Sequence, residues 1–480
     1  MNYRKIAHYL GIILLTEAAL MLLPVAIGLI YHEKATASFL ITIGILAAVG
    51  WLFYNRKPHK NNIYSKEGYI IVAAAWLLMS AFGALPMFIS EAIPNYMDAF
   101  FETVSGFTTT GSTILTEIES LPRCVLFWRS FTHFIGGMGI LVFVLAVMPR
   151  SEGSSIHIMK AEVPGPVVGK LVSKVTVTAR ILYGIYIGMT VLLIILLKIV
   201  GFPVFDSIVT AFGTAGTGGF AIMNNSIEGY CNPAAEVIIS VFMMLFGLNF
   251  NLYYLILIKQ WRSALKDEEM RWYFGIIAAA TFIITLDLTV MRHPFSESIR
   301  YAFFQVTSII STTGFTSTDY DMWPSITKAV LLMLMYIGGC TGSTGGGLKV
   351  QRIAVLVKNS IRSIRKAANP RRVETIKING RTLDEGIVSG ITGHFAMYMI
   401  LVAFSIVIVA LDGYDLTTTL SAVSACINNV GPGFALVGPA GNFSDFSYLS
   451  KIVLSFNMLA GRLELIPMLM LFSKIGISND

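Results

Sequence analysis

Residues 309–316 read IISTTGFT, a short run of serine, threonine and glycine in a chain that is otherwise strongly apolar. Three similar runs occur elsewhere: VSGFTTTGST at 104–113, AFGTAGTGGFA at 211–221 and CINNVGPGF at 426–434. Such residues are poor helix formers and leave backbone carbonyl groups without helical partners. Four such runs in one apolar chain therefore require a structural explanation.

The composition identifies the broad class of the chain. Of its 480 residues, 55% are hydrophobic and only 13% are charged, whereas soluble proteins carry about 25% charged residues. The apolar residues form stretches of about 20 residues, which is the length that crosses a bilayer as a helix. We therefore predict a polytopic, all-α membrane protein, and we interpret the first apolar stretch as a retained span rather than a secretory signal.

Ten apolar stretches have spanning length, and four shorter ones do not. The spanning stretches are 9–31, 37–54, 68–90, 124–148, 180–202, 234–258, 273–291, 326–348, 387–411 and 447–473. The shorter ones, near 97–108, 205–216, 299–311 and 416–428, fit half-helices that enter the membrane and turn back. Basic residues gather in alternate loops, most densely from Lys349 to Arg381, which predicts that these loops and both termini are cytoplasmic. These loops explain the net charge of +7, so we expect no nucleic-acid partner.

The four polar runs are predicted to be copies of one unit. They align on Gly111, Gly219, Gly314 and Gly431, and each follows one half-helix. A small residue recurs at one earlier position: Ser105, Gly213, Ser308 and Ala425. Asp98 and Asp206 stand at one offset near the start of the first two half-helices, where a carboxylate would cap the free amides. Each unit therefore reads span, half-helix, loop, span.

This repeat predicts the domain organisation. We expect four tandem span–pore-helix–span repeats around one pore, with two extra N-terminal spans. The predicted divisions are 1–67 for the two leading spans and a cytoplasmic loop, 68–150 for repeat 1, 151–260 for repeat 2, 261–380 for repeat 3 with a broken second span and a basic cytoplasmic extension, and 381–480 for repeat 4.

The four loops are candidates for an ion-selective filter. An extended loop at membrane depth needs protein around it and a lumen to face. Four loops about an axis would direct backbone carbonyl groups inward, where they replace the hydration shell of a monovalent cation. Glycine is required where φ is positive and where no Cβ can be accommodated. The predicted filter residues are Thr109, Thr110, Gly111, Ser112, Thr217, Gly218, Gly219, Phe220, Thr312, Thr313, Gly314, Phe315, Asn429, Val430, Gly431 and Pro432.

At these residues the sequence resembles the Trk/Ktr/HKT superfamily of potassium transporters. The segments VSGFTTTGS, AGTGGF, STTGFTS and NNVGPGF are similar to its four filter segments. GGCTGSTGGGLKVQRI, GRLELIP and the two leading spans resemble its TrkH branch more than its KtrB branch. The resemblance covers essentially the whole chain.

The resemblance implies uptake of potassium, with K+ bound at the filter residues. It also implies a homodimer in the bacterial inner membrane, regulated by a cytosolic RCK-type partner. Nucleotide is then expected on the partner, and no cofactor is expected in this chain. KtrB-like, sodium-dependent uptake is the alternative, and both channel-like conduction and H+- or Na+-coupled symport stay open.

A second glycine-rich segment predicts a gate. Residues 339–347 carry Gly339, Gly342, Gly345, Gly346 and Gly347, and they should break the eighth span. The segment does not fit the phosphate-binding loop pattern, because Leu348 precedes the lysine. Arg462 lies within the last apolar stretch, where a buried arginine usually faces a partner or an aqueous path. We predict that the loop closes the pore sterically below the filter and that Arg462 closes it electrostatically.

Other function classes find less support in the sequence. A membrane enzyme acting on lipids would need convergent carboxylates or histidines, and we find no such motif, so we expect no enzyme. An inverted-repeat transporter is disfavoured because all four half-helices are predicted on one side of the membrane. His133 and His394 lack a second ligand at helical spacing and are predicted to be ordinary core residues. The four cysteines are scattered and predict neither a disulfide framework nor a zinc site.

Overall fold

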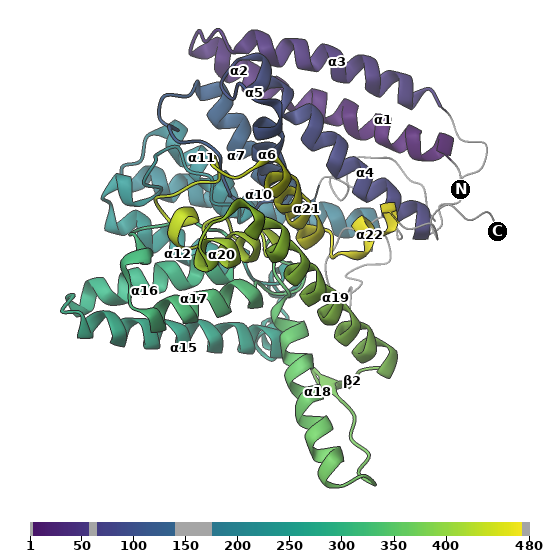
Figure 1. Ribbon diagram of the computed structural model, residues 1–480, viewed down its shortest axis with the longest axis vertical. Coiled ribbons are helices and arrows are strands. Elements are labelled where there is room, and N and C mark those ends of the chain that lie inside the picture. The colour runs from purple at the N-terminus through teal and green to yellow at the C-terminus, as the bar shows by residue number, and fades with distance from the viewer. Residues whose placement is uncertain (1–2, 57–64, 140–174, 473–480) are drawn as a thin grey trace.

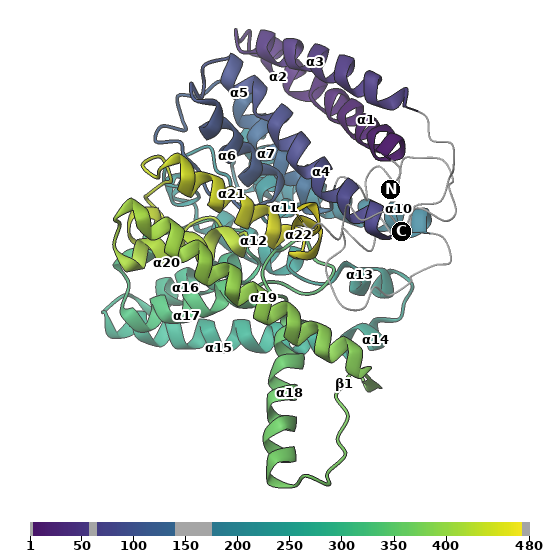
Figure 2. The ribbon, with the colours of Figure 1, turned by 45° about the vertical axis from the view of Figure 1, so that its right-hand side comes forward.

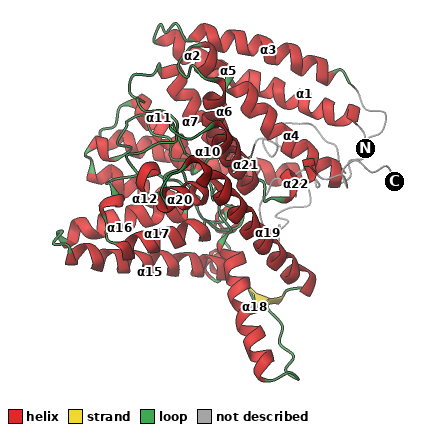
Figure 3. Cartoon of the chain, viewed as in Figure 1, coloured by secondary structure: helices red, strands yellow, loops and turns green. Residues whose placement is uncertain are grey.

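The computed structural model describes residues 3–56, 65–139 and 175–472 (Figure 1). These residues are predominantly helical, and Figure 3 shows a single short strand pair among them. The strands β1 (Lys377–Ile378) and β2 (Arg381–Thr382) pair antiparallel after the long helix α18 (Val350–Ala368). The predicted all-α fold is confirmed.

The helices follow the order that the sequence predicts. The leading spans contain α1 (Tyr3–Leu20), α2 (Leu22–Ile30) and α3 (Thr36–Tyr54). Next come α4 (Ser65–Gly83), α5 (Leu85–Ile89), the half-helix α6 (Tyr96–Phe107) and α7 (Arg123–Gly137). The second group contains α10 (Val175–Ile199), the half-helix α11 (Val204–Gly216), α12 (Pro233–Phe246) and α13 (Phe250–Leu257), followed by α14 (Trp261–Leu265). The third group contains α15 (Glu268–Val290), the half-helix α16 (Phe295–Ile310), α17 (Ser325–Ile337) and α18. The fourth contains α19 (Glu385–Val409), the half-helix α20 (Leu416–Ile427), α21 (Tyr448–Arg462) and α22 (Ile466–Phe472). Short 3-10 helices at Glu228–Tyr230, Tyr320–Met322, Ala410–Asp412 and Ala435–Val437 lie in the connecting loops.

Six of the described helices or helix pairs are long and apolar enough to cross a membrane. They are Tyr3–Ile30, Thr36–Tyr54, Glu67–Ile89, Val177–Ile199, Glu268–Val290 and Glu385–Asp412. A seventh span forms if α12 and α13, which meet at a bend of 91°, are taken together. Each of the four half-helices ends within one residue of its predicted end.

Several predicted spans are broken. The stretch 326–348 is helical only to Ile337, as its glycines predict. The stretches 234–258 and 447–473 were expected to be continuous, and this expectation is wrong. The first breaks at residues 247–249, where the Asn249 side chain caps α13 by accepting from the amide of Asn251 at 2.9 Å. The second breaks at Glu464 and Leu465, whose φ angles of 63° and 60° are left-handed. Of the stretch 124–148, the part after residue 139 lies outside the described residues.

The expected caps of the first two half-helices also differ from the structure. The N-cap of α6 is Asn95, whose side chain accepts from the amide of Met97 at 2.8 Å. Asp98 instead pairs with Lys451 of α21 at 2.6 Å. α11 begins after a proline without a side-chain cap, and Asp206 accepts from the hydroxyl of Tyr230 at 3.0 Å. Both carboxylates therefore connect segments rather than cap their own helix.

The helices pack around the half-helices. Figure 1 shows α1 and α3 side by side along one edge and α15, α16 and α17 along the opposite edge. The half-helices α6, α11 and α20 lie between these edges. Buried apolar side chains form one large cluster that joins the leading spans to the first and fourth groups of helices, and two further clusters centred on the second and third groups. In Figures 1 and 2, α18 extends away from this packed body.

Candidate functional site

The four half-helices end with the same backbone geometry. The residue two positions before each aligned glycine is left-handed, with φ of 55° at Thr109, 56° at Thr217, 61° at Thr312 and 55° at Asn429. The next amide donates back to the carbonyl of the recurring small residue. These bonds are Thr110 to Ser105 at 2.9 Å, Gly218 to Gly213 at 2.9 Å, Thr313 to Ser308 at 2.8 Å and Val430 to Ala425 at 2.9 Å. This is the hydrogen bond of a Schellman helix end, and here it turns each chain out of its helix at the same point.

The four loops that follow form a closed ring. We call them the filter loops: residues 109–112, 217–220, 312–315 and 429–432. Each aligned glycine lies so close to a carbonyl of another loop that an added Cβ atom would collide with its oxygen. The distance from the added Cβ atom to the carbonyl oxygen would be 2.0 Å for Gly111 and Gly218, 2.0 Å for Gly219 and Thr313, 2.0 Å for Gly314 and Val430, and 2.7 Å for Gly431 and Thr110. The contacts run from loop one to two, three, four and back to one.

The glycines of this ring are required for a second reason. Their φ angles are 84° at Gly111, 75° at Gly219, 82° at Gly314 and 100° at Gly431, a region that residues with a Cβ rarely adopt. A cavity lies on one side of the ring, and all four glycines line it together with Ser112, Phe220 and Pro432. The structure thus brings all four predicted filter segments together at the base of one opening.

Side-chain bonds connect the fourth loop to the first. The Asn429 amide nitrogen donates to Oγ1 of Thr110 at 3.0 Å and to the carbonyl of Met458 at 2.8 Å. The Ser112 hydroxyl donates to the carbonyl of Gly431 at 3.1 Å. The asparagine that departs from the Thr/Gly pattern of the other loops therefore fastens its loop to a neighbour and to α21.

His133 has a role that the sequence analysis missed. It is fully buried, as predicted, but it contacts filter backbone rather than apolar core alone. Its Nδ1 lies 2.7 Å from the Gly106 carbonyl oxygen, and its Nε2 lies 3.2 Å from the amide nitrogen of Phe220. Because a carbonyl only accepts and an amide only donates, this geometry requires the neutral tautomer protonated at Nδ1. His394 of α19, by contrast, lies with its Nε2 3.4 Å from Nη1 of Arg352 on α18.

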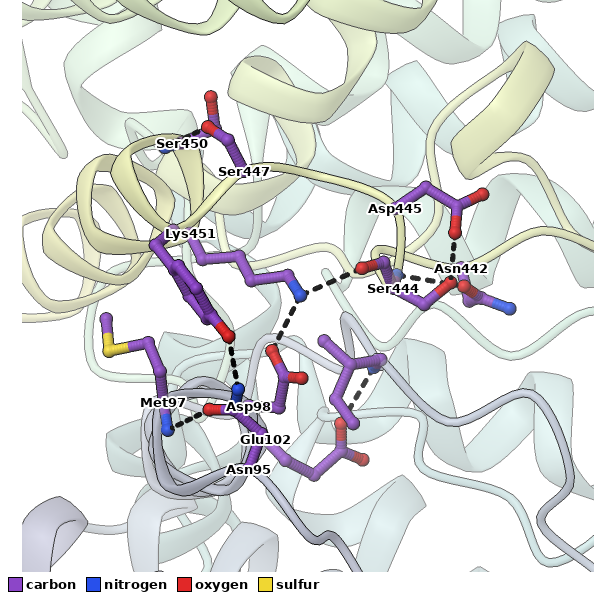
Figure 4. A network of polar contacts seen from close by, with 12 residues as sticks. Asn95, Met97, Asp98, Glu102, Asn442, Ser444, Asp445, Ser447, Ser450 and Lys451 are labelled. Carbon is purple, nitrogen blue, oxygen red and sulfur yellow. Dashed lines mark hydrogen bonds and ion pairs between the residues drawn. The ribbon is translucent and has the colours of Figure 1, made fainter.

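A polar network holds the N-terminal end of the first half-helix, as Figure 4 shows. The Lys451 ammonium donates to Asp98 at 2.6 Å and to the Ser444 carbonyl at 2.8 Å. On the next turn of α6, Glu102 accepts from the backbone amide of Ile114 at 3.0 Å. α6 is therefore anchored both to the last span and to the segment that leaves its own filter loop.

Beneath the ring lies the segment that the sequence predicts to be a gate. We call residues 338–349 the inner loop. A Cβ atom at Gly345 would lie 2.7 Å from the Ser311 carbonyl oxygen, and one at Gly346 would lie 2.6 Å from the Asn428 carbonyl oxygen. The Gly346 amide also donates to Oγ1 of Thr312 at 2.6 Å. The inner loop thus packs directly against the ends of the third and fourth half-helices.

Arg462 connects the inner loop to the end of α7. One guanidinium nitrogen donates to the Thr344 carbonyl at 2.6 Å, and the other donates to the carbonyls of Gly136 and Gly137 at 2.6 Å each. The residue is only 9% exposed. The prediction assigned Arg462 an electrostatic role, and the structure adds a bridge between the end of α7 and the inner loop.

Acidic residues at the start of α15 hold both ends of the inner loop. The Glu269 carboxylate accepts from the Thr341 amide at 2.6 Å and from the Gln351 amide at 3.2 Å. Glu268 pairs with Lys358 of α18. Because Gln351 and Lys358 lie on α18, the start of α15 connects this helix to the inner loop.

The segment that includes α18 carries many basic residues. We call residues 350–384 the hairpin. Arg362 pairs with Glu385 at 2.5 Å, and Arg365 pairs with Glu374 at 2.7 Å. Lys366, Arg371 and Arg372 line a cavity together with Arg362, Glu374 and Glu385. The four cysteines are free, as the sequence predicts.

The comparisons with known proteins cover nearly the whole chain. Residues 32–479 match the family TrkH, which is described as a cation transport protein. The Trk system potassium uptake protein TrkH of Salmonella typhimurium is 35% identical over 98% of this chain and 99% of its own length. The Trk system potassium uptake protein TrkG of Escherichia coli is 32% identical over 98% of both chains. The crystal structure of the potassium transporter TrkH from Vibrio parahaemolyticus matches with a TM-score of 0.90 and 31% identity, and it covers 100% of each chain.

Proposed function

Because this chain belongs to the TrkH family of cation transport proteins, we propose that it takes up potassium through the ring of filter loops. Potassium uptake is the function named for its relatives, and it is the function of this multi-pass membrane protein. The chain is a transporter, and K+ is the ion it carries.

The single observation that supports the filter is the closed ring of four glycine-to-carbonyl contacts. Thr110, Gly218, Thr313 and Val430 occupy the same position in their loops, and the carbonyl oxygen of each lies against the glycine of another loop. Such a ring of carbonyl oxygens replaces the water shell of a dehydrating K+. The half-helices end at the ring, so their negative ends favour a cation just beneath it.

We assign the gate to the inner loop and Arg462. The inner loop lies in contact with the third and fourth filter loops, so its displacement would open a path below them. Arg462 holds it there through Thr344 and places a positive charge beside the path. The hairpin follows the inner loop directly in the chain, so a partner that binds the hairpin could displace the inner loop.

The assembly follows from family resemblance and charge. We propose a homodimer in the bacterial inner membrane with both termini in the cytoplasm. A cytosolic RCK-type subunit would bind the basic hairpin and carry the regulatory nucleotide, while this chain carries no cofactor. The four repeats at 68–150, 151–260, 261–380 and 381–480, preceded by two spans in 1–67, form one pore.

Ion uptake by purified protein in liposomes tests this proposal. We expect K+ to enter in preference to Na+, and we expect the chain to restore growth of an uptake-deficient bacterium at low K+. Growth that requires added Na+ would favour the sodium-dependent, KtrB-like alternative. Liposomes that take up K+ no faster than protein-free controls would contradict the assignment.

A further inference from the structure

Three residues outside the predicted filter segments connect the first two filter loops. Glu102 lies on α6, and Arg129 and His133 lie one turn apart on α7. We infer that these three residues, which we call the clamp, are positioning residues that set the discrimination between K+ and Na+. This inference rests on the proposed function, because it concerns how the filter is held.

Glu102 holds the segment that leaves the first filter loop. Its carboxylate accepts from Oγ1 of Thr113 at 2.9 Å, from the Ile114 amide at 3.0 Å and from Nε of Arg129 at 2.6 Å. The side chain is 0% exposed. A buried carboxylate with three donors fixes the positions of all three, because leaving any of them unpaired is costly.

Arg129 carries this connection to the second loop. Nη1 donates to the Ala221 carbonyl at 2.8 Å, and the guanidinium carbon lies 3.7 Å from the ring centroid of Phe220. His133 accepts from the Phe220 amide and lies 4.2 Å from the same ring, centroid to centroid. Phe220 is thus held through both its backbone and its side chain.

The clamp acts where the two loops meet. Phe220 lies two residues after Gly218, whose carbonyl contacts Gly111 of the first loop. An added Cβ atom at Gly218 would also lie 2.4 Å from the His133 ring. Selectivity depends on the number and positions of the carbonyl groups around the ion. Residues that fix this carbonyl against Gly111 therefore influence which ion it suits.

The charges of the clamp balance. Glu102 and Arg129 are both almost completely buried, at 0% and 2% exposure, and electrostatic interactions are strong in such surroundings. Removal of either charge would leave the other unbalanced beside the ion path. The third half-helix has an uncharged residue, Gln305, at the position of Glu102. Neither polar atom of the buried Gln305 side chain has a hydrogen-bond partner in the structure, whereas the Glu102 carboxylate has three donors. The first and third half-helices therefore differ in how this position is bonded.

Uptake measurements on purified variants in liposomes test the clamp. Glu102→Gln leaves Arg129 unbalanced and should raise the KM for K+, whereas Arg129→Gln leaves the carboxylate and should lower it. Both should reduce the K+/Na+ uptake ratio by about tenfold, the size of effect expected when one charged hydrogen bond is lost. Arg129→Lys keeps the charge and should restore the KM without fully restoring the ratio.

Another ion pair that joins a half-helix to a neighbouring helix provides a matched control. Glu236 of α12 pairs with Arg300 of α16 at 3.4 Å. Glu236→Gln removes the same type of charge as Glu102→Gln, and it should leave the K+/Na+ ratio unchanged. Melting temperatures of all variants separate loss of folding from loss of selectivity.

The K+/Na+ uptake ratios of these variants decide whether the clamp sets selectivity. If folded Glu102→Gln and Arg129→Gln keep the wild-type ratio, the clamp is a packing feature and the inference is wrong. A ratio that falls equally in Glu236→Gln would contradict it as well. If the glutamine variants do not fold, Arg129→Lys decides alone, and an unchanged ratio there overturns the clamp. Wild-type liposomes report separately on the proposed function, since a wild type without K+ uptake contradicts both proposals.

Discussion

The filter loops and the inner loop lie in contact, but they are built in different ways. The filter loops repeat one backbone four times, with the same left-handed residue, the same returning hydrogen bond and the same glycine. The inner loop belongs to one quarter, and unlike side chains from α15 and α21 hold it. Selection of a spherical ion suits equivalent groups around an axis, whereas a gate requires only one segment that can move. The difference suggests that repetition serves selectivity and departure from it serves control.

The largest effect should come from adding one methyl group to the repeated ring. Gly314→Ala places a Cβ atom 2.0 Å from the Val430 carbonyl oxygen at a φ of 82°. The ring cannot keep its geometry, and we expect K+ uptake to fall about 100-fold, as when a preorganised site shifts by about 1 Å. Uptake into liposomes measures this loss.

The control for this substitution is Gly390→Ala, because a Cβ at Gly390 meets no atom within 4 Å. This variant should transport K+ normally, since alanine is also the better helix former. Comparable uptake by the two variants would contradict the importance of the ring.

A smaller effect of opposite sign should follow from loosening the inner loop. Arg462→Ala removes three hydrogen bonds, and deletion of Gly345–Gly347 shortens the loop itself. The closed state should lose about 2 kcal/mol, so K+ flux without a partner should rise by about tenfold or more. Folded variants of both kinds with wild-type flux would place the gate elsewhere.

A still smaller increase should follow from Glu269→Gln. The amides of Thr341 and Gln351 both donate to the same oxygen, Oε1 of Glu269, so the glutamine carbonyl oxygen can still accept them, but these bonds lose the strength of a charged acceptor. We expect partner-free K+ flux to rise by about threefold, which corresponds to less than 1 kcal/mol. Arg462→Ala and Glu269→Gln combined should exceed either alone; a decrease in flux for Glu269→Gln would contradict its role in holding the loop closed.

The smallest effect on the chain's own transport should come from the hairpin. Neutralising Arg362, Arg365, Arg371 and Arg372 together breaks the exposed or partly exposed ion pairs of Arg362, Arg365 and Arg372, and such pairs contribute little to stability. Partner-free uptake should therefore stay near the wild-type value, while co-purification with an RCK-type subunit should be lost. Undiminished co-purification would remove this segment from the interface.

The sequence predicted the elements that repeat more successfully than those that do not. The half-helices were found because four polar runs, each preceded by a short apolar segment, have a single physical explanation. The recurring small residue proved to be the acceptor of the returning hydrogen bond, as at Ser105 and Ser308. The breaks at 247–249 and 464–465 were missed, because each lies within a longer apolar stretch that has the length of a continuous span. Gly247 and Pro467, next to these breaks, were the available signals.

Contacts between distant side chains were the least predictable part. His133 was judged by its own helix, where no second ligand occurs, but its partners Gly106 and Phe220 come from other segments. Arg462 was recognised because a charged side chain is energetically costly in an apolar stretch, but the carbonyl groups that it binds could not be identified from the sequence. Such partners are set by how the repeats pack around the axis, and the pattern within one segment does not contain that information.

A diffraction experiment with Tl+, a heavy substitute for K+, tests the filter most directly. Anomalous density should lie inside the ring, surrounded by the carbonyl oxygens of Thr110, Gly218, Thr313 and Val430, and it should weaken as K+ is added in competition. Density absent from the ring, or confined to carboxylates elsewhere in the protein, would contradict a filter formed by these four loops.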